Sequence, residues 1–314
     1  MENYDLDILI KVCNLKYKEK MQQKEIAKLL KLSTAKVTRL LQKAFELDIV
    51  KVSINDINLQ ITKLESDLEK KFQLRRVFIS KSENENADDI KKKIGQRIAG
   101  YLLTILKDKD CMGISHSSTI KEIIQSLPIQ INKKVDVVQM MGGSYNMGFV
   151  GVDKTKELSD RFGVSPHILY APLFVDKERI KRAILQDSSI KESFSFFKNI
   201  NITLVGIGSF YPLGSSTIFM SGSLSGEEIA ELQEHKVAGD IYGHFFCEDG
   251  NFCNTSIEKR MITIPMEYIP KIELRIGVAG GLEKFTAIHA AIKGRLINIL
   301  ATDEKTGEKL LSVI

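Results

Sequence analysis

Four apolar runs in the second part of the chain end in glycines and hydroxyl-bearing residues. They read "GISHSSTI" from Gly113, "MMGGSYNMG" from Met140, "GIGSF" from Gly206 and "VAGGLEK" from Val278. In open α/β sheets, ligands bind outside the carboxyl ends of the strands. Glycine lets backbone amides approach an anion there, and a following helix adds its positive end. The four runs together therefore predict a ligand site that suits a phosphate group.

The best phosphate candidates are "SSTI" and "GGLEK", because each opens a predicted helix and the second adds the cation of Lys284. Each pattern is weak alone, since many glycine-rich strand ends are only tight turns. "GIG" is no dinucleotide fingerprint, because the third glycine and the downstream acidic residue are missing. The candidate ligand-binding residues are Gly113, Ser115, Ser117, Ser118, Thr119, Gly142, Gly143, Gly208, Ser209, Asp240, Gly280, Gly281 and Lys284.

Two charged residues near a predicted hairpin each have two interpretations. Asp240, expected just before the hairpin, either caps a turn or accepts hydrogen bonds from ligand hydroxyls. Arg260 pairs either with an acidic ligand or with a surface carboxylate, and we slightly favour the surface pair. The dipeptide Asp249–Gly250 is a strong signal for the hairpin turn itself.

Metal and redox chemistry are not indicated. The five histidines are scattered without paired-ligand spacing, so we expect no metal site and no cofactor. The cysteines show no CxxC spacing, and we interpret all of them as reduced cytosolic thiols. Two of them could face each other across the "EDG" turn, but we disfavour a redox or metal role. The four are Cys13, Cys111, Cys247 and Cys253.

The elements that position these residues alternate between apolar strand-like runs and amphipathic helical stretches from residue 75 onward. This rhythm predicts a parallel sheet covered by helices on both faces. The expected strands are "RVFIS", "CMGIS", "VDVVQMMGG", "HILYAPLFV", "NITLVGIGS", "LRIGVAGG" and "INILATDE". The expected helices cover residues 88–106, 118–127, 152–162, 177–186, 189–198, 225–236 and 284–293, with a final helix at the end.

The first residues have a different pattern. Apolar spacing predicts helices over about residues 4–19 and 22–30, and Ser33 or Thr34 caps a third helix. "IVKVSI" then alternates as a strand that acts as a wing. This is the pattern of a winged helix-turn-helix, whose third helix enters the major groove of DNA. The alternative is a three-helix protein-interaction module with a solvated basic face.

The charge distribution favours DNA. Residues 1–55 hold ten Lys and one Arg against seven Asp or Glu, a net charge of +4, whereas the remainder holds 34 basic against 33 acidic residues. We expect Lys36 and Arg39 on bases or phosphates, and the start of the second helix on phosphates. The candidate DNA-binding residues are Gln22, Gln23, Lys24, Ser33, Thr34, Lys36, Thr38, Arg39 and Lys43.

We therefore predict three segments: a winged helix-turn-helix over 1–55, a linker helix over 56–74, and an α/β ligand-binding domain over 75–314. The linker helix is a candidate for pairing two heads, since such proteins read half-sites about 34 Å apart as dimers. No apolar run approaches the roughly 18–20 residues that span a bilayer. The acidic, amphipathic N-terminus does not resemble a signal peptide, so we expect a cytoplasmic protein without a membrane partner.

Over essentially its whole length, the chain resembles SorC/DeoR-type sugar-binding transcriptional regulators of bacteria. The resemblance lies in "QQKEIAKLLKLSTAKVTRLLQKA", "GIS.SSTI", "VVQMMGG", "APLFV" and "LVGIGS". It is most specific in "GDIYGHFF.EDG" and "VAGGLEKFTAIHAAIKGRLINILATDE". It implies a Rossmann-like body related to sugar-phosphate isomerases and deaminases, a phosphorylated sugar or polyol as effector, and homotetramers built from dimers.

Carried over by motif, the resemblance gives roles to single residues. Ser118 and Thr119 would hold phosphate or neighbouring hydroxyls, Asp240 sugar hydroxyls, and Lys284 phosphate. Two departures stand out. The family often has "GISWG" where this chain has "GISHSS", which affects ligand shape or loop conformation. The lysine that forms a Schiff base in the deoxyribose-phosphate-responsive branch is replaced here by Met141.

Three functions compete. A ligand-controlled regulator that binds double-stranded operator DNA as a homo-oligomer is favoured. A sugar-phosphate isomerase or deaminase with an appended head needs a positioned acid and base. Asp240, His116 and Glu283 are the available types, but no pair stands at a telling spacing, so we expect no enzyme. A scaffold protein is disfavoured by the charge concentrated in residues 1–55.

Overall fold

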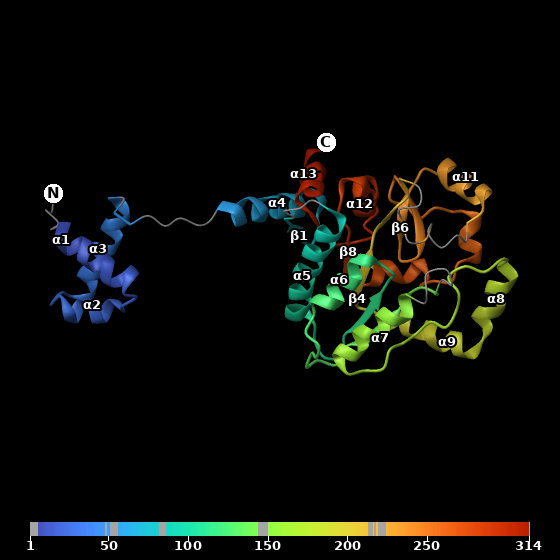
Figure 1. Cartoon of the computed structure of the whole chain (residues 1–314), viewed down its shortest axis with the longest axis horizontal. Coiled ribbons are helices and arrows are strands. Elements are labelled where there is room, and N and C mark those ends of the chain that lie inside the picture. Colours follow the sequence, from blue (N-terminus) through green and yellow to red (C-terminus); the bar gives the residue numbers. More distant parts are fainter. Residues whose placement is uncertain are drawn as a thin grey trace. The chain divides into compact units, whose positions relative to one another are not determined.

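The computed structural model of the chain describes residues 6–47, 49–50, 56–81, 86–143, 150–212, 216, 218 and 224–313, with the backbone alone at 56–59 and 150–151. It divides into two compact units, Met1–Leu59 and Gln60–Ile314, which we call the head and the body. Figure 1 labels their elements along the chain.

The head is a bundle of short helices around its own small core. Its elements are α1 (Leu6–Cys13), a π-helical continuation η1 (Asn14–Lys18), α2 (Gln23–Leu29) and α3 (Thr34–Glu46). The Ser33 side chain accepts a hydrogen bond from the Lys36 amide at 3.2 Å, so the predicted cap begins α3. Leu9, Ile26 and Val37 are fully buried between the helices. The wing strand expected over residues 49–54 lies outside the described residues from Lys51 onward.

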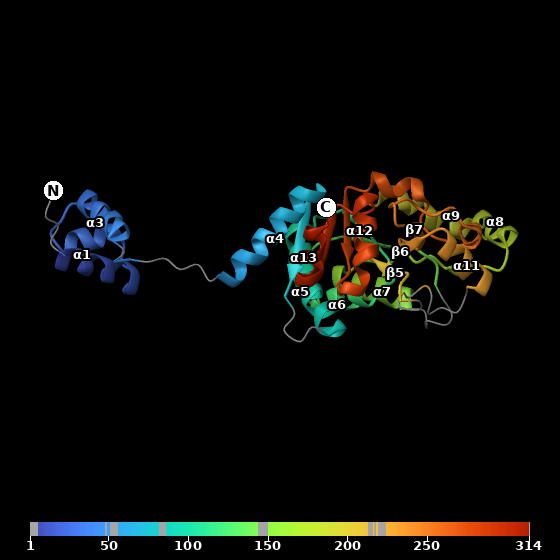
Figure 2. The same cartoon turned by 90° about the horizontal axis from the view of Figure 1, so that it is seen from above.

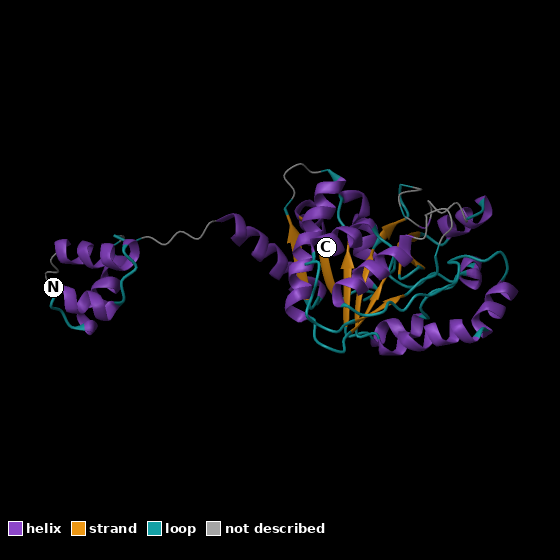
Figure 3. Cartoon of the chain, turned by 60° about the horizontal axis from the view of Figure 1, so that its bottom comes forward, coloured by secondary structure: helices purple, strands orange, loops and turns teal. Residues whose placement is uncertain are grey.

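The body is built on one six-stranded parallel sheet, as the alternation of strand and helix predicts (Figure 3). Its strands lie in the order β1–β9–β8–β4–β2–β3, so the first and last strands of the chain are neighbours. The bounds are β1 (Arg76–Ser80), β2 (Cys111–Ile114), β3 (Asp136–Gln139), β4 (Ile202–Gly206), β8 (Leu274–Val278) and β9 (Ile299–Asp303).

Helices cover both faces of this sheet, and each face has its own core. In β1, Phe78 packs into one core, while Val77 and Ile79 pack into the other, because successive strand residues point to opposite faces. One core packs against α5 (Ala87–Ile105), α6 (Ser118–Ser126) and α7 (Val150–Phe162). The other packs against α4 (Asp56–Phe72), α12 (Phe285–Lys293) and α13 (Glu304–Ser312).

Helix α4 corresponds to the segment that the sequence assigns to a linker. From Gln60 onward it belongs to the body, and its Ile61 and Leu68 are buried in the body core. The Lys71 ammonium donates to the carbonyl of Leu311 at 2.7 Å. Figure 2 shows α4 beside α13, which agrees with these contacts. The boundary between the two units therefore falls inside this helix.

A second sheet of three short antiparallel strands was not predicted. It consists of β5 (Gly208–Ser209), β6 (Val237–Ile241) and β7 (His244–Cys247). The β6–β7 hairpin turns at Tyr242 and Gly243, whose φ angles of 59° and 83° suit a tight primed turn. One sequence expectation is therefore wrong, because Asp240 lies inside β6 and not before the hairpin. Asp249–Gly250 reverses the chain after β7, and Phe252 then forms an antiparallel bridge with Phe246.

The prediction of a strand at "HILYAPLFV" is also wrong. Its residues form only isolated bridges, from His167 to Val138, from Pro172 to Gly143 and from Phe174 to Met261. Proline cannot donate to a ladder, and it interrupts the run. The remaining elements are α8 (Glu178–Gln186), α9 (Ser188–Ser195), η3 (Phe196–Asn199), α11 (Gly226–Glu234), η4 (Ser256–Arg260), η5 (Met266–Lys271) and η6 (Leu282–Lys284).

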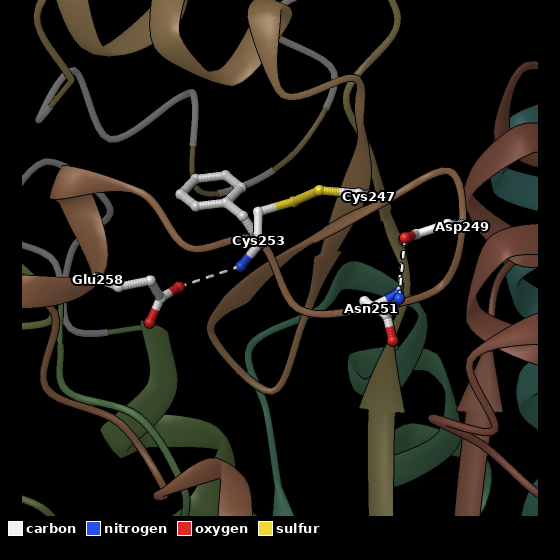
Figure 4. The surroundings of a disulfide bond; sticks show 6 residues. Cys247, Asp249, Asn251, Cys253 and Glu258 are labelled. Atoms are coloured by element: carbon white, nitrogen blue, oxygen red, sulfur yellow. Dashed lines mark hydrogen bonds between the residues drawn. A yellow bond between two sulfur atoms is a disulfide. The ribbon is translucent and has the colours of Figure 1, made fainter.

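The cysteines differ from the expectation of four reduced thiols. Cys247 and Cys253 are joined by a disulfide, with their Cα atoms 5.7 Å apart, which suits such a bond (Figure 4). The bend after β7 brings the two residues together. Cys13 and Cys111 are free and buried.

Candidate functional site

The predicted ligand residues gather where the strand order of the large sheet reverses. The chain leaves β2 for β3 on one side and later returns to β4 on the other side. Open α/β sheets bind ligands at such a point, outside the carboxyl ends of the strands. Here the Ser115 hydroxyl, just after β2, accepts a hydrogen bond from the Gly206 amide at the end of β4, at 3.2 Å. A Cβ atom on Gly206 would collide with the Ser117 side chain. The end of β4 therefore lies directly against the loop that follows β2.

The loop after β2 leads directly into α6. Ser117 caps this helix and accepts from the Thr119 amide at 3.2 Å. Ser118 is exposed in the first turn, and Thr119 is buried. The first turn of a helix presents unpaired amides and the positive end of the helix dipole, so Ser118 lies where an anion is favoured.

Lys154 in α7 supplies a buried cation next to this helix start. Its side-chain nitrogen donates to the Ser117 carbonyl at 2.8 Å, and only 8% of the residue is exposed. Burial, and secondly the nearby Lys121, lower the pKa of Lys154 to about 8. Sequence reasoning missed this residue. The signal was a lysine four positions before buried Leu158, which places a charge on the apolar stripe of a helix.

His116 lies in the loop after β2, where the sequence resemblance leads us to expect an aromatic residue. Burial lowers the pKa of His116 to about 4, so its imidazole is neutral near pH 7. Its Nε2 lies 3.5 Å from the Met141 carbonyl, which also accepts from the Gln139 side chain at 2.7 Å. The carbonyl can only accept, so a hydrogen bond across this distance requires the Nε2–H tautomer of His116. These contacts connect the loop after β2 with the loop after β3.

Asp240 brings a carboxylate to the site from the small sheet. It pairs in register with Gly208, and the Ser216 hydroxyl donates to its Oδ1. Burial raises the pKa of Asp240 to about 6, while the bond from Ser216 and the charge of Lys284 act in the opposite direction. A half-buried carboxylate with accepting capacity to spare is suited to ligand hydroxyls.

The loop after β8 brings Lys284 towards Asp240. Burial lowers the pKa of Lys284, and the negative charges of Asp240 and Glu283 partly raise it. Its Nζ lies 3.5 Å from the Ile207 carbonyl, at the end of β4. Gly281 adopts a φ angle of +104°, a backbone conformation that residues with a side chain rarely adopt. Its amide donates a hydrogen bond to the Asp303 carboxylate at 2.6 Å. Asp303 thereby fixes the glycine pair that precedes Lys284.

Two cavities open beside these loops. One of about 320 Å³ is lined by Ala87, Ile90, Gly281, Leu282, Glu283, Asp303, Glu304 and Lys305. The other, of about 610 Å³, is lined by Asn86, Asp88, Asp89, Lys91, Lys92, Ser118, Lys121 and Glu122. The start of α5 contributes to both. Gly281 and Ser118, two predicted residues, therefore border open space.

Not every predicted glycine lies at open space. Gly113 sits inside β2, where a Cβ atom would collide with the Met140 side chain. Gly142 packs against the backbone of Ala171 and Pro172, and Gly280 packs against Ile90. Gly143 has open space where a side chain would be. The structure therefore places Gly113, Gly142 and Gly280 at close packing contacts, whereas Gly143 borders free volume.

Two further predicted residues have defined partners. The Ser209 hydroxyl donates to the carbonyls of Tyr211 at 2.6 Å and Glu283 at 3.2 Å, which connects β5 to the loop that carries Lys284. Arg260 pairs with the Glu228 carboxylate through two bonds of 2.6 Å. The carboxylate partner favoured from the sequence is therefore present, although both side chains are largely buried.

In the head, the predicted DNA-binding residues lie on α2 and α3 or at the N-caps of these helices. Gln22, Lys24, Ser33, Thr34, Lys36 and Arg39 are exposed. The Thr38 hydroxyl donates to the Gln23 side chain at 2.9 Å, so these two residues connect the helices. Lys43 forms an ion pair with Glu46 at 2.8 Å. Lys36 and Arg39 thus present the exposed cations of α3.

Neither a metal site nor a membrane segment is seen in the described part of the chain. No group of three His, Cys, Asp or Glu residues there could hold a metal ion. Within the same residues, no helix is long and apolar enough to cross a membrane.

The chain is similar to known regulators over nearly its full length. The Sugar-bind family model, which describes a sugar-binding domain, matches residues 56–312. The chain is 29% identical over 314 residues to the deoxyribonucleoside regulator of Bacillus subtilis (strain 168), covering 99% of both chains. It is 28% identical over 321 residues to the sorbitol operon regulator of Klebsiella pneumoniae, covering 99% of this chain and 100% of the relative.

Solved structures of regulators superpose on this chain as well. The crystal structure of the full-length sorbitol operon regulator SorC from Klebsiella pneumoniae superposes with a TM-score of 0.76 at 27% identity, covering 99% of this chain and 100% of that chain. A DeoR family transcriptional regulator from Listeria monocytogenes superposes with a TM-score of 0.73 at 25% identity, covering 80% and 99%. The chain therefore belongs to the SorC/DeoR-type family of sugar-binding transcriptional regulators.

Proposed function

We propose that the chain is a DNA-binding regulator whose operator affinity is controlled by a phosphorylated sugar or polyol. The observation that carries the proposal is the half-buried pair of Asp240 and Lys284, each of which shifts the pKa of the other beside the carboxyl ends of the strands. Asp240 accepts hydrogen bonds from ligand hydroxyls, and Lys284 binds an acidic group. One carboxylate and one ammonium in the same site match a ligand that has both hydroxyls and a phosphate.

The surroundings favour a phosphate over a neutral sugar. The first turn of α6, at Ser118, adds the positive end of a helix. The side-chain nitrogen of Lys154 donates a hydrogen bond to the carbonyl of Ser117, just before this turn. Lys121 lowers the pKa of Lys154, so two cations lie near one helix start. A buried cation is costly without an anion. Binding of a phosphate would relieve that cost, which supports an anionic effector.

The head supplies the DNA contacts in this proposal. Lys36 and Arg39 lie exposed on α3, and the start of α2 adds Lys24. Phosphate contacts release counterions and give affinity for any sequence, while α3 reads base edges in the major groove. The relatives are named transcriptional regulators, which supports a sensing role for the body.

Control of DNA binding requires two heads in a fixed relation. We propose a homo-oligomer, a dimer or tetramer, that works in the cytoplasm and reads two half-sites about 34 Å apart. The effector shifts the equilibrium between two arrangements of heads only by its differential affinity for them. Closure of the loops around Asp240 and Lys284 is the proposed source of that difference.

The test is thermal unfolding of the pure protein against phosphorylated sugars and polyols. Matched unphosphorylated sugars and inorganic phosphate serve as controls. A ligand at about 100 times its Kd stabilises the native state by roughly 2.7 kcal/mol. The stabilisation should be lost in Lys284→Ala and kept in Lys293→Ala, an exposed lysine at the end of α12, the helix that Lys284 precedes as N-cap. A flat panel, or equal loss in both variants, would reject the phosphate site.

A further inference from the structure

The bend that follows β7 holds two cysteines side by side. The Cys247 amide donates to the Asn251 carbonyl, and the Gly250 amide donates to the Cys247 carbonyl, both at 2.9 Å. The Cys253 amide donates to the Phe245 carbonyl, also at 2.9 Å. These main-chain bonds fix the Cα separation of 5.7 Å without help from the sulfur atoms. The two thiols therefore stay within bonding reach when the disulfide is reduced.

Side chains fix the same bend. The Asn251 amide and side-chain nitrogen donate to the two Asp249 oxygens at 2.9 and 2.8 Å (Figure 4). On the other side, Glu258 of η4 accepts from the Phe245 amide at 3.4 Å. Figure 4 shows Cys253 between these two anchors. Neither anchor involves sulfur, so oxidation and reduction need no rebuilding of the bend.

The two cysteines differ in access, and the other two cysteines of the chain are poor reactants. Cys247 is partly exposed, whereas Cys253 is 3% exposed. Cys111 is buried in β2, and burial raises the pKa of its thiol to about 12. Burial also raises the pKa of Cys13 in the head. A reagent in solution therefore meets Cys247 first, with Cys253 next to it as the resolving thiol.

The setting argues against a permanent crosslink. Disulfides in compartments that hold thiol buffers are usually transient or redox-sensing. A DNA-binding regulator works in such a compartment, so this step of the inference rests on the proposed function. We propose that Cys247 and Cys253 are a redox modification site, a reversible dithiol–disulfide couple that exchanges with low-molecular-weight disulfides.

The exchange takes two balanced steps. The Cys247 thiolate attacks one sulfur of the small disulfide, so a mixed disulfide forms and one small thiolate leaves. The Cys253 thiolate then attacks the Cys247 sulfur, which forms the internal bond and releases the second small thiolate. The two leaving thiolates take up the two protons that the cysteines lose. The protein is oxidised by two electrons, and the small disulfide is reduced to two thiols.

The couple lies in the sheet that carries Asp240. Cys247 pairs with Val237, and Phe245 pairs with Asp240, along the same two strands. Crosslinking ties the bend to β7 and so restrains the main chain beside Asp240. Oxidation is therefore expected to slow hydrogen exchange of the β6 and β7 amides.

Mass spectrometry of the full chain tests the couple. Trypsin cuts after Lys236 and Lys259, so one peptide carries both cysteines. After equilibration in glutathione buffers of rising disulfide content and alkylation, that peptide should shift from two alkyl groups to none. Cys247→Ser and Cys253→Ser should stay open to alkylation or glutathione. The double variant Cys13→Ser/Cys111→Ser should behave like the wild type. Alkylation of both cysteines in every buffer, or glutathione retained as the final product, would overturn the proposal.

Hydrogen exchange of the same peptide tests the restraint. The oxidised protein should exchange several-fold more slowly than the reduced protein, and Cys253→Ser should match the reduced rate in both buffers. Equal rates for the oxidised and reduced wild type would refute the link to the Asp240 sheet. Neither measurement requires DNA or an effector, so failure of the proposed regulator function would leave both results interpretable.

Discussion

Gly208 and Asp240 lie opposite each other in the β5–β6 pair, and the Asp240 carboxyl group fills the space that a side chain at position 208 would need. A Cβ atom on residue 208 would come within 2.7 Å of the Asp240 Cγ and 2.8 Å of the Ser216 hydroxyl. The absence of a side chain at one position therefore places the carboxylate at the other.

Gly208→Ala should move Asp240 and weaken both folding and ligand binding. Overpacking of this kind typically costs about 1–3 kcal/mol. Urea denaturation measures the free energy of unfolding, and calorimetry measures effector affinity. Gly100→Ala is the matched control, because its Cβ meets open space on α5. That control should gain about 0.5–1 kcal/mol from helix propensity. Equal stability of both variants would contradict the close contact.

Asp240→Asn should make the protein without effector more stable at neutral pH. Burial raises the folded-state pKa to about 6 from 3.8. The folded state therefore binds more protons than the unfolded state across this interval, and stability falls as pH rises through it. The loss is on the order of 3 kcal/mol. Asparagine carries no charge and still accepts from Ser216, so the variant should lack this fall.

Urea denaturation of wild type and Asp240→Asn between about pH 4.5 and 7.5 checks this expectation. The two stability curves should separate as pH rises, with the variant higher. Effector binding should weaken in the variant most clearly above about pH 6, where Asp240 of the wild type is a carboxylate. Parallel curves would show that Asp240 does not titrate in this interval.

Lys154→Met should remove a pH dependence of effector binding near pH 8. Burial lowers the pKa of Lys154 to about 8, so its charge is lost as pH rises through that value. In the wild type, affinity for a phosphorylated effector should fall over the same range, by up to about tenfold for one lost charged contact. The variant should start lower and change less. Identical pH profiles in calorimetry would exclude Lys154 from the anion site.

Arg39→Ala should weaken DNA binding and its salt dependence. Loss of one phosphate contact reduces the slope of log K against log salt by about 1. Lys11→Ala on α1 is the control, since it removes an exposed lysine from the same unit but from a different helix. Fluorescence anisotropy over a salt series measures the slopes. A smaller slope in Lys11→Ala than in Arg39→Ala would move the DNA-binding face away from α3.

The parallel sheet and the helix-turn-helix were predictable because they depend on local, repeated patterns. Residues such as Val77, Phe78 and Ile79 form a continuous apolar run, which is typical of a strand buried on both faces. Ser33 caps α3 through a bond to a residue three positions away. Signals of this range are contained in any short window of sequence.

The small sheet and its site contacts were not predictable in the same way. Tyr242 at φ 59° turns the β6–β7 hairpin, although no Asn-Gly or Asp-Gly pair marks that turn. β6 packs against β5 and α12, which lie elsewhere in the sequence. Lys154 reaches Ser117 across 37 positions of sequence, and no short window shows that contact. The sequence indicates candidate residue types for a ligand site, but tertiary contacts decide which of those residues meet.

The pairing of β1 with β9 has a consequence for how the protein is made. Arg76 lies opposite Ile299, so the large sheet closes only after almost the whole chain has left the ribosome. The head depends on contacts within its first fifty residues, and such local folds form early. During each round of synthesis, a nascent chain therefore carries a folded DNA-binding head before its sensor exists. Early release or truncation would leave a head that no metabolite can control.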